Sequence, residues 1–364
     1  MNKIRIAHLA DFHLGAQLNG RKELNEKVNK ALIKSLVNIF DVLNSAKVQL
    51  VLIAGDFYES SNIDTSLKSQ IKEIFSNFNG KIVISPGNHD YISLESVYFE
   101  EWPKNTYIFT SENVDYFEFN EINTRVYGFA FTNSHIREHL ISNIGVIDDS
   151  YINIGVFHGQ IDSTENSYHP IFAEDILNSN LDYIALGHVH KRSEINQIGR
   201  TYYAYSGNPV GRGFDETGEK GIYLGDISKD KNGLYFYKID NSEFHIVNLE
   251  IEDFESQNEL ANFIKRKLEE KFGVNYKKHY YRLILNGYLK KDQTINIDII
   301  ESMMTDFNYI EIIDNTNLYM DFDEISHEKS LKGKFVKKVL TENISAEDKK
   351  KILDIGVRAF EDLL

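Results

Sequence analysis

Near the start of the chain lies the stretch Ile4-Arg5-Ile6-Ala7-His8-Leu9-Ala10-Asp11-Phe12-His13, a strand-like apolar run that ends in an acid and a histidine. Four further motifs follow similar apolar runs: Gly55-Asp56, Gly87-Asn88-His89-Asp90, His158-Gly159 and Gly187-His188-Val189-His190. Polar groups placed where neighbouring strands end gather at one edge of a sheet. The pattern therefore predicts one polar site assembled from five separated segments.

Composition limits the classes of protein. With 364 residues, the chain is long enough for two domains. It has no cysteine, which excludes disulfides and thiolate ligands, so any metal must be held by nitrogen and oxygen. The net charge of −15 weighs mildly against broad coating of duplex nucleic acid, since such surfaces are usually basic. No apolar run approaches the roughly 18 residues of a membrane span and no signal-peptide pattern is evident, so we expect a cytoplasmic protein without a membrane partner.

The first 240 residues alternate short apolar runs with helical patterns. The runs predict strands at 4–10, 49–54, 81–85, 152–157, 182–186 and 201–205. Apolar residues that recur every three or four positions predict helices at 24–43 and 67–78. Strand–helix–strand–helix order indicates an α/β sandwich with parallel pairing at its start.

The pattern changes after residue 240. Strands are predicted at 244–251, 280–285 and 309–313, with helices at 258–272 and 297–304 between them. A capping-box pattern, Ser345-Ala346-Glu347-Asp348, opens a last helix whose apolar side would dock on the protein itself or on a partner. We expect a domain at 1–240, a small α/β domain at 245–320 and a C-terminal helical segment at 321–364.

The motifs contain the residue types of a metal centre: Asp11, His13, Asp56, Asn88, His158, His188 and His190. Asp11 and His13 share one face of an extended segment, so both can turn toward one cation. Asp56 follows a glycine that allows close approach to the backbone, and its carboxylate could bridge two cations. Mixed nitrogen and oxygen ligands suit Mn, Fe or Zn better than Ca or Mg. Two such ions about 3.5–4 Å apart are suited to the hydrolysis of phosphate esters.

His89 needs a different role. It lies between Asn88 and Asp90, and its side chain cannot easily point at the same cation as the side chains of both neighbours. A protonated imidazole here can act as general acid toward the leaving oxygen. Asp90 would then orient the ring, as a carboxylate does for other catalytic histidines.

A single histidine after an apolar run is usually an ordinary packed or loop residue. That interpretation fails for the five motif histidines, because they occur jointly with three acids and an amide. It holds for His8, which we expect to be packed or hydrogen-bonded, and we expect solvated side chains at His135, His139, His279 and His327. For His169 a position lining the site stays open beside the favoured loop interpretation.

The order and residue patterns of the motifs resemble those of the calcineurin-like metallophosphoesterases, which carry D-x-H, G-D, G-N-H-[DE], lone His and G-H-x-H blocks. The resemblance covers roughly residues 1–215. It implies a four-layer α/β/β/α sandwich with a smaller C-terminal α/β capping domain and terminal helices. It also implies two divalent ions, most simply Mn²⁺, with His89 as the catalytic histidine. One ion would take Asp11, His13, Asp56 and His190, and the other Asp56, Asn88, His158 and His188.

The opening residues 6–15 and the segments 205–209, 212–216 and 220–221 look like the SbcD-type DNA-repair exonucleases. In that family the capping domain helps position DNA, and C-terminal helices engage an SMC-like ATPase of the SbcC type. The resemblance implies both partners and leaves a homodimer open. One departure concerns Glu59, which stands near the place where many relatives carry a second histidine, so a histidine dyad cannot be assumed.

Candidates for contacts to substrate phosphates are Lys191, Arg192 and Arg212, because their neighbours belong to the metal loops. The lysines at 329–338 are more simply a solvated face. The combined features favour a Mn-dependent DNA exonuclease that works in double-strand-break repair or end processing beside the ATPase. Two alternatives stay open: a phosphodiesterase or phosphatase for small nucleotides, and a non-catalytic scaffold subunit, which the intact ligand set disfavours.

Overall fold

A computed structural model describes residues 3–17, 22–60, 63–145, 147–161, 167–229, 231–239, 242–251, 253–290 and 293–361. The chain divides into two compact units. The first comprises Met1–Ile246, Val274–Arg282 and Asp306–Ile310, and the second comprises Val247–Gly273, Leu283–Thr305 and Glu311–Leu364.

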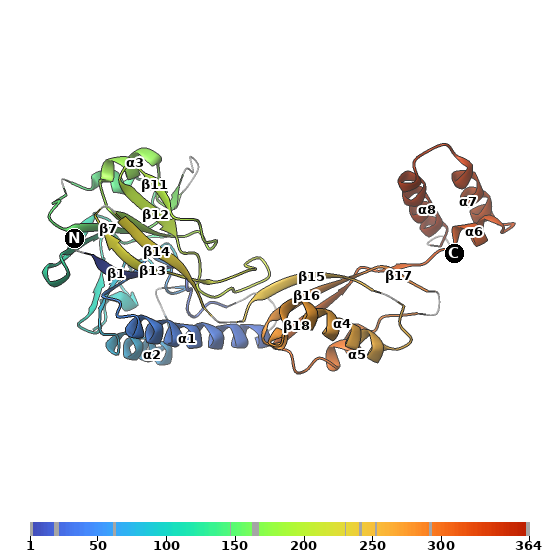
Figure 1. The fold of residues 1–364 in the computed structure, drawn as a ribbon, viewed down its shortest axis with the longest axis horizontal. Coiled ribbons are helices and arrows are strands. Elements are labelled where there is room, and N and C mark those ends of the chain that lie inside the picture. Colours follow the sequence, from blue (N-terminus) through green and yellow to red (C-terminus); the bar gives the residue numbers. More distant parts are fainter. Residues whose placement is uncertain are drawn as a thin grey trace. The chain divides into compact units, whose positions relative to one another are not determined.

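Two large mixed sheets form the described part of the first unit (Figure 1). The first sheet has the order β14-β13-β1-β2-β3-β4. Its parallel strands are β1 (Ile4–Leu9), β2 (Leu50–Ile53), β3 (Lys81–Ile84) and β4 (Thr106–Ile108). The hairpin β13 (Gly221–Ser228) and β14 (Lys231–Lys238) joins β1 in antiparallel fashion.

The second sheet has the order β11-β12-β10-β7-β6-β5. Its parallel strands are β6 (Thr124–Gly128), β7 (Ile152–His158), β10 (Tyr183–Gly187) and β12 (Thr201–Tyr205). The edge strands β5 (Asp115–Phe119) and β11 (Asn196–Ile198) are antiparallel to their neighbours. Both sheets therefore bring parallel central strands, with their carboxyl ends aligned, to the region of the predicted site.

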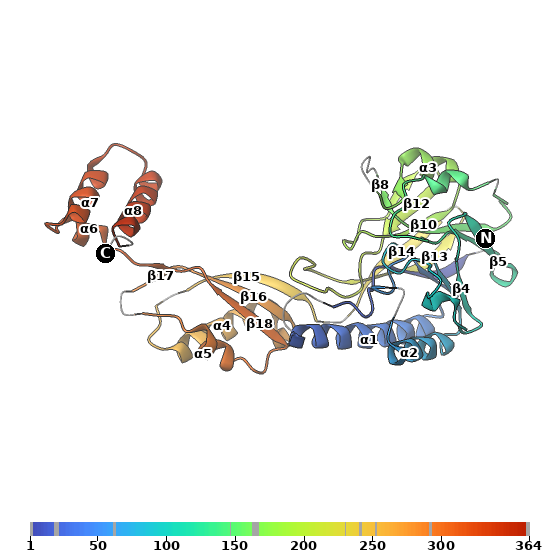
Figure 2. The same cartoon turned by 180° about the vertical axis from the view of Figure 1, so that it is seen from behind.

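Helices cover the outer faces of the two sheets (Figures 1 and 2). α1 (Lys22–Ser45) and α2 (Thr65–Ser76) lie on the first sheet, and α3 (Ala173–Ser179) lies on the second. α1 buries the face predicted from its spacing, including Val28, Leu32, Leu36, Ile39 and Leu43. The four-layer α/β/β/α sandwich is thereby confirmed.

His8 lies buried between the two sheets and links them. Its Nδ1 is 2.8 Å from the hydroxyl of Tyr183 on β10, and its Nε2 is 3.1 Å from the carbonyl of Leu186 on the same strand. Burial lowers the pKa of His8 to about 3, so the ring is neutral. The expectation of a packed, hydrogen-bonded histidine is confirmed.

A further three-stranded sheet has the order β15-β16-β18 within the described chain. Its elements alternate along the sequence as β15 (Phe244–Glu250), α4 (Gln257–Phe272), β16 (Tyr280–Asn286), α5 (Ile297–Ser302) and β18 (Tyr309–Asp314). α4 begins at Ser256, whose side chain accepts the backbone N–H of Glu259 at 3.2 Å. The strands and helices predicted after residue 240 are thus present.

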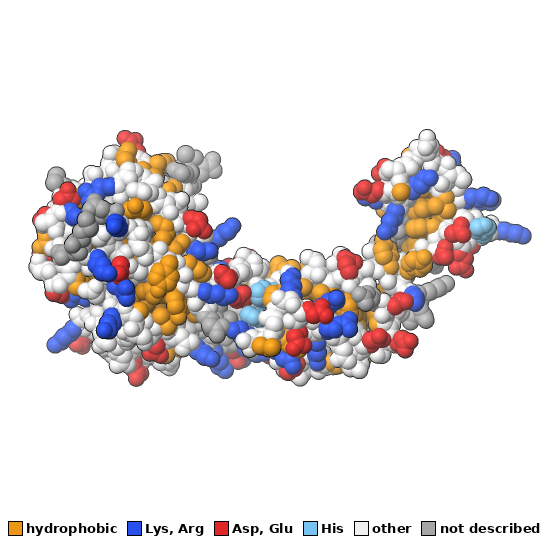
Figure 3. Space-filling view, viewed as in Figure 1, with side chains coloured by type: hydrophobic (Ala, Val, Ile, Leu, Met, Phe, Trp, Pro, Cys, Tyr) orange, Lys and Arg blue, Asp and Glu red, His pale blue; other side chains and the backbone are white. Residues whose placement is uncertain are grey.

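The last helices are α6 (Phe322–Ser326), α7 (Leu331–Thr341) and α8 (Ala346–Glu361). Ser345 caps this last helix as predicted, because its hydroxyl accepts the N–H of Asp348 at 3.0 Å. The carboxylate of Asp348 accepts from the same hydroxyl at 2.6 Å, which replaces the bond to the backbone N–H of Ser345 that a full capping box has. A small core joins α7 and α8 through Val336, Val339, Leu353 and Val357. Apolar side chains also lie at the surface of this segment (Figure 3), at Leu331, Leu340, Ile344, Ile352 and Ile355. Among the described helices, none combines the length and apolar character of a membrane span.

Candidate metal centre

The structure brings the predicted metal ligands together. They lie at the carboxyl ends of β1, β2 and β3 in the first sheet and of β7 and β10 in the second: Asp11, His13, Asp56, Asn88, His158, His188 and His190. Close packing of the two sheets explains the convergence. At Gly55 (φ +83°) a Cβ would lie 2.3 Å from Nδ1 of His158, so only glycine lets the opposite strand approach, as its position before Asp56 predicted.

The ligand atoms fall into two groups. Asp11, His13 and His190 offer atoms that lie within 4.8 Å of one another, with the two Nε2 atoms 3.1 Å apart. In the other group, Oδ1 of Asn88 is 2.9 Å from Nε2 of His158 and 3.3 Å from Nδ1 of His188. Atoms bound to one ion at about 2.1 Å lie roughly 3.0–3.4 Å apart. The distances of 2.9–3.3 Å measured in the two groups therefore match the spacing of a coordination shell.

Asp56 stands between the two groups. Its Oδ2 is 3.6 Å from Nε2 of His13 and 3.3 Å from Nε2 of His158. Its Oδ1 accepts the backbone N–H of His89 at 2.9 Å, which holds the carboxylate in place. One carboxylate oxygen thus faces ligands of both groups, the geometry that a bridging ligand requires.

An unsatisfied carboxylate oxygen indicates what the cluster binds. Oδ1 of Asp11 accepts the N–H of His188 at 2.9 Å, whereas its buried Oδ2 has no hydrogen-bond partner among the described residues. Burial raises the pKa of Asp11, because the anion has lost water. A buried, unpaired acceptor costs about 1–3 kcal/mol or more, a cost that a bound cation removes. The donor set therefore fits divalent metal ions.

Backbone strain is concentrated in the same residues. Asp11, His13, Asp56 and His188 have φ values of 55°, 48°, 48° and 98°, in the left-handed region that side chains rarely adopt. Such conformations cost on the order of 1–3 kcal/mol each and cluster at functional sites, where the surrounding structure holds them.

Carboxylates outside the ligand groups orient two of the histidines. Nδ1 of His13 is 2.7 Å from Glu59, and Nδ1 of His190 is 2.6 Å from Glu216. A proton on each Nδ1 leaves Nε2 free to face an ion. Neither role was predicted from the sequence, in which Glu59 stood out only as a departure from the relatives and Glu216 only as part of segment 212–216.

His89 lies beside the first ligand group. Its ring centre is 4.7 Å from that of His13, and 41% of its side chain is exposed. Its Nδ1 is 3.5 Å from Oε1 of Glu59, and this proximity raises the pKa of His89. The raised pKa favours the protonated form of a ring that is accessible and next to the candidate ions.

Asp90 does not lie where it was expected. Its buried carboxylate accepts backbone N–H groups from Gly87 (2.7 Å), Phe57 (2.9 Å) and Tyr58 (3.2 Å), and the hydroxyl of Tyr98 (2.5 Å). The expectation that Asp90 orients the neighbouring ring is wrong, because these donors turn its oxygens toward the loop after β2. Glu59 occupies the place against His89 instead.

Comparison with known proteins identifies the family. The family model for calcineurin-like phosphoesterases matches residues 4–192, more than half of the 364-residue chain. The chain belongs to this family. The resemblance drawn from the five motifs is confirmed, and with it a phosphoesterase whose fold binds divalent metals.

Three relatives are similar to part of the phosphoesterase, which spans 60% of the first of them. It is 30% identical over 247 residues to the uncharacterized metallophosphoesterase YhaO of Bacillus subtilis, over 63% of this chain and 60% of that protein. It is 25% identical over 269 residues to a subunit of nuclease SbcCD from Staphylococcus epidermidis (63% and 67%). It is 24% identical over 265 residues to the DNA double-strand break repair protein Mre11 of Methanopyrus kandleri (65% and 56%).

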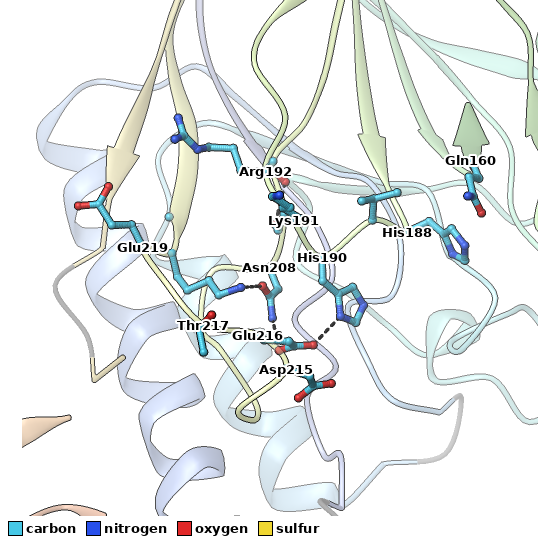
Figure 4. Close-up of a pocket in the computed structure, with 15 residues that line it drawn as sticks. Gln160, His188, His190, Lys191, Arg192, Asn208, Asp215, Glu216, Thr217 and Glu219 are labelled. Carbon is cyan, nitrogen blue, oxygen red and sulfur yellow. Dashed lines mark hydrogen bonds and ion pairs between the residues drawn. The ribbon is translucent and has the colours of Figure 1, made fainter. Parts of the chain in front are cut away.

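Lys191, Arg192 and Arg212, the three residues predicted to contact substrate phosphates, lie near the candidate metal ligands of the phosphoesterase. Arg212 reaches between the carboxylates, with Nη1 3.5 Å from Glu59 and Nη2 3.3 Å from Glu216. Lys191 and Arg192 are exposed and line a hollow of about 870 Å³ beside His190 (Figure 4).

The other histidines of the phosphoesterase differ in burial. His135, His139 and His327 are exposed as expected. His169 is buried, and its Nδ1 lies 3.0 Å from the backbone carbonyl of His158, so it contacts the main chain of a candidate metal ligand. The expectation of a solvated His279 is wrong. This residue is buried at the start of β16, where its Nδ1 accepts the N–H of Glu243 at 3.1 Å.

Metal uptake by the phosphoesterase is expected to release a proton. Burial alone would lower the pKa of His158, but the carboxylates of Asp56 and Asp11 raise it to about 9. A ligating imidazole must be neutral, so below pH 9 the ring loses its proton on binding and affinity rises up to about tenfold per pH unit. Calorimetry of Mn²⁺ binding in buffers of different ionisation heat measures the release; heats independent of buffer at pH 7 would contradict it.

Proposed function

We propose that the phosphoesterase hydrolyses DNA phosphodiester bonds as an exonuclease, with two divalent ions, most simply Mn²⁺. The observation that carries this proposal is the pair of ligand groups that share Oδ2 of Asp56, with His89 beside them. The names of two relatives, one belonging to nuclease SbcCD and the other Mre11, support DNA as the substrate.

The ligands would be divided as the two groups indicate. Asp11, His13 and His190 would hold one ion, Asn88, His158 and His188 the other, and Asp56 both. When bound, such a pair of ions supplies activation of water and charge stabilisation at the phosphoryl group.

His89 would supply the proton that the departing sugar oxygen needs. Glu59, whose Oε1 is 3.5 Å from Nδ1 of His89, would favour the protonated form of the imidazole. Lys191, Arg192 and Arg212 would contact phosphates, Lys191 and Arg192 through the open hollow, which has the size of a nucleotide site.

A second substrate class is favoured by charge. The chain carries a net charge of −15, which repels a long polyanion and suits a small nucleotide better.

Partners form a separate part of the proposal. We infer that the phosphoesterase acts in the cytoplasm beside an SMC-like ATPase, which the exposed apolar residues of α7 and α8 within segment 321–364 would contact. In this scheme residues 1–240 form the nuclease domain and 245–320 the capping domain.

Incubation with Mn²⁺ and two substrates tests the function. We expect the purified protein to shorten end-labelled linear DNA and to hydrolyse bis(p-nitrophenyl) phosphate, while closed circular DNA, which has no ends, stays intact. Turnover of the chromogenic diester alone would support the small-nucleotide alternative. If the protein hydrolyses neither substrate although elemental analysis shows bound metal, the result would support the non-catalytic scaffold subunit.

A further inference from the structure

The two ligand groups differ in charge. The first subsite (Asp11, His13 and His190) and the second subsite (Asn88, His158 and His188) share Asp56. The first therefore offers two carboxylates to its ion, whereas the second offers one, because its remaining oxygen ligand is the neutral amide of Asn88. Attraction to a divalent cation at about 2 Å is stronger for the first subsite.

The groups behind the histidines increase this difference. In the first subsite, His13 and His190 each face a carboxylate through Nδ1, at 2.7 Å from Glu59 and 2.6 Å from Glu216. In the second subsite, Nδ1 of His158 faces the neutral carbonyl of Ala54 at 3.0 Å. A carboxylate behind a ligating histidine fixes the ring and makes its free nitrogen a stronger ligand.

Glu216 is held in this position from several sides. Its Oε2 accepts the N–H of Arg212 at 2.8 Å and the amide of Asn208 at 2.6 Å, and Lys220 donates to the same amide's oxygen at 2.7 Å. Figure 4 shows Glu216 between Asn208 and His190. The carboxylate cannot turn away from His190 without losing these bonds.

Arg212 lies between the two carboxylates, with Nη1 3.5 Å from Glu59 and Nη2 3.3 Å from Glu216. Its guanidinium offsets part of their charge and leaves each carboxylate in contact with its histidine.

We propose that the two metal subsites are unequal: the first subsite fills first and more tightly, and Glu59 and Glu216 are the positioning residues that make it so. The second ion would then exchange more readily than the first. This inference rests on the two-metal centre of the proposed function.

Titration of metal-free protein with Mn²⁺ tests the proposal without any measurement of activity. Calorimetry is expected to resolve two binding steps whose affinities differ at least tenfold, and at one equivalent the electron paramagnetic resonance spectrum should show an isolated ion. Glu59→Gln and Glu216→Gln keep the size and an acceptor oxygen but remove the charge. Each should weaken the tighter step by about 10–100-fold and leave the weaker step unchanged.

Asp215→Asn is the matched control, because Asp215 neighbours Glu216 along the chain and lines the same hollow. This variant should retain both wild-type affinities. Two equal steps in the wild type, or a spin-coupled pair already at one equivalent, would overturn the inequality without any variant. Equal weakening of both steps in the glutamine variants would overturn the role of the two carboxylates. Failure of the wild type to bind Mn²⁺ would instead refute the metal centre itself.

Discussion

Replacing His89 with glutamine is expected to lower kcat on DNA by on the order of 10²–10⁴-fold, the usual contribution of a positioned general acid. The ring lies beside the first ligand group, and its proximity to Glu59 raises the pKa of His89, which favours the protonated form that a general acid needs. Metal content should not change, because the bond that holds Asp56 comes from the backbone N–H of His89. Elemental analysis and single-turnover cleavage of labelled DNA measure the two quantities.

The leaving group provides a sharper test of this role. p-Nitrophenolate departs without a proton, so His89→Gln should lose much less activity on bis(p-nitrophenyl) phosphate than on DNA. His327→Gln, at an exposed histidine that follows α6, is the control and should behave as wild type. Equal losses on both substrates would assign His89 to another task, such as binding phosphate.

The sequence was sufficient to predict the ligand groups, because each ligand follows its own strand and strand order fixes where the carboxyl ends meet. It was not sufficient for the groups behind them. Glu59 and Glu216 are 46 and 26 positions from the histidines that they contact, and no local pattern encodes such a pairing. Tertiary packing alone brings them together.

Asp90 shows the opposite error. Adjacency to His89 in the sequence suggested a contact, but successive residues of an extended segment point to opposite sides. The unpaired N–H groups of Gly87, Phe57 and Tyr58 then determine where the carboxylate lies. Local backbone donors decide the position of a buried acid more strongly than its neighbour does.

The strands that were not predicted lie mainly at sheet edges. β5 (Asp115–Phe119) and β14 (Lys231–Lys238) carry charged or polar residues among their aromatic ones and are largely exposed. Edge strands tolerate such residues, which also discourage pairing with other chains, so their apolar signal is weak. The buried strands that place the site gave the stronger signal, although the inner strands β6 (Thr124–Gly128) and β13 (Gly221–Ser228), which are also largely buried, were not predicted.

Asp56→Ala is expected to have the largest effect, with both ions lost together and hydrolysis reduced to the background of metal-free protein. One oxygen of Asp56 lies 3.6 Å from Nε2 of His13 and 3.3 Å from Nε2 of His158, so a single truncation removes a ligand from each group. Charge stabilisation by the ions contributes several kcal/mol. At about 1.4 kcal/mol per factor of ten, the loss of rate should be at least about 10³-fold.

Metal analysis after gel filtration in limiting Mn²⁺ shows whether Asp56→Ala loses both ions or only one. Asp41→Ala removes an exposed carboxylate of α1, outside the hollow, and should keep both ions and full activity. Asp56→Asn retains an oxygen to accept the N–H of His89 but lacks the charge, so it should lose metal affinity while keeping the loop after β3 in place. Retention of one ion at wild-type affinity by Asp56→Ala would show that Asp56 serves a single subsite, and the bridging geometry would have to be abandoned.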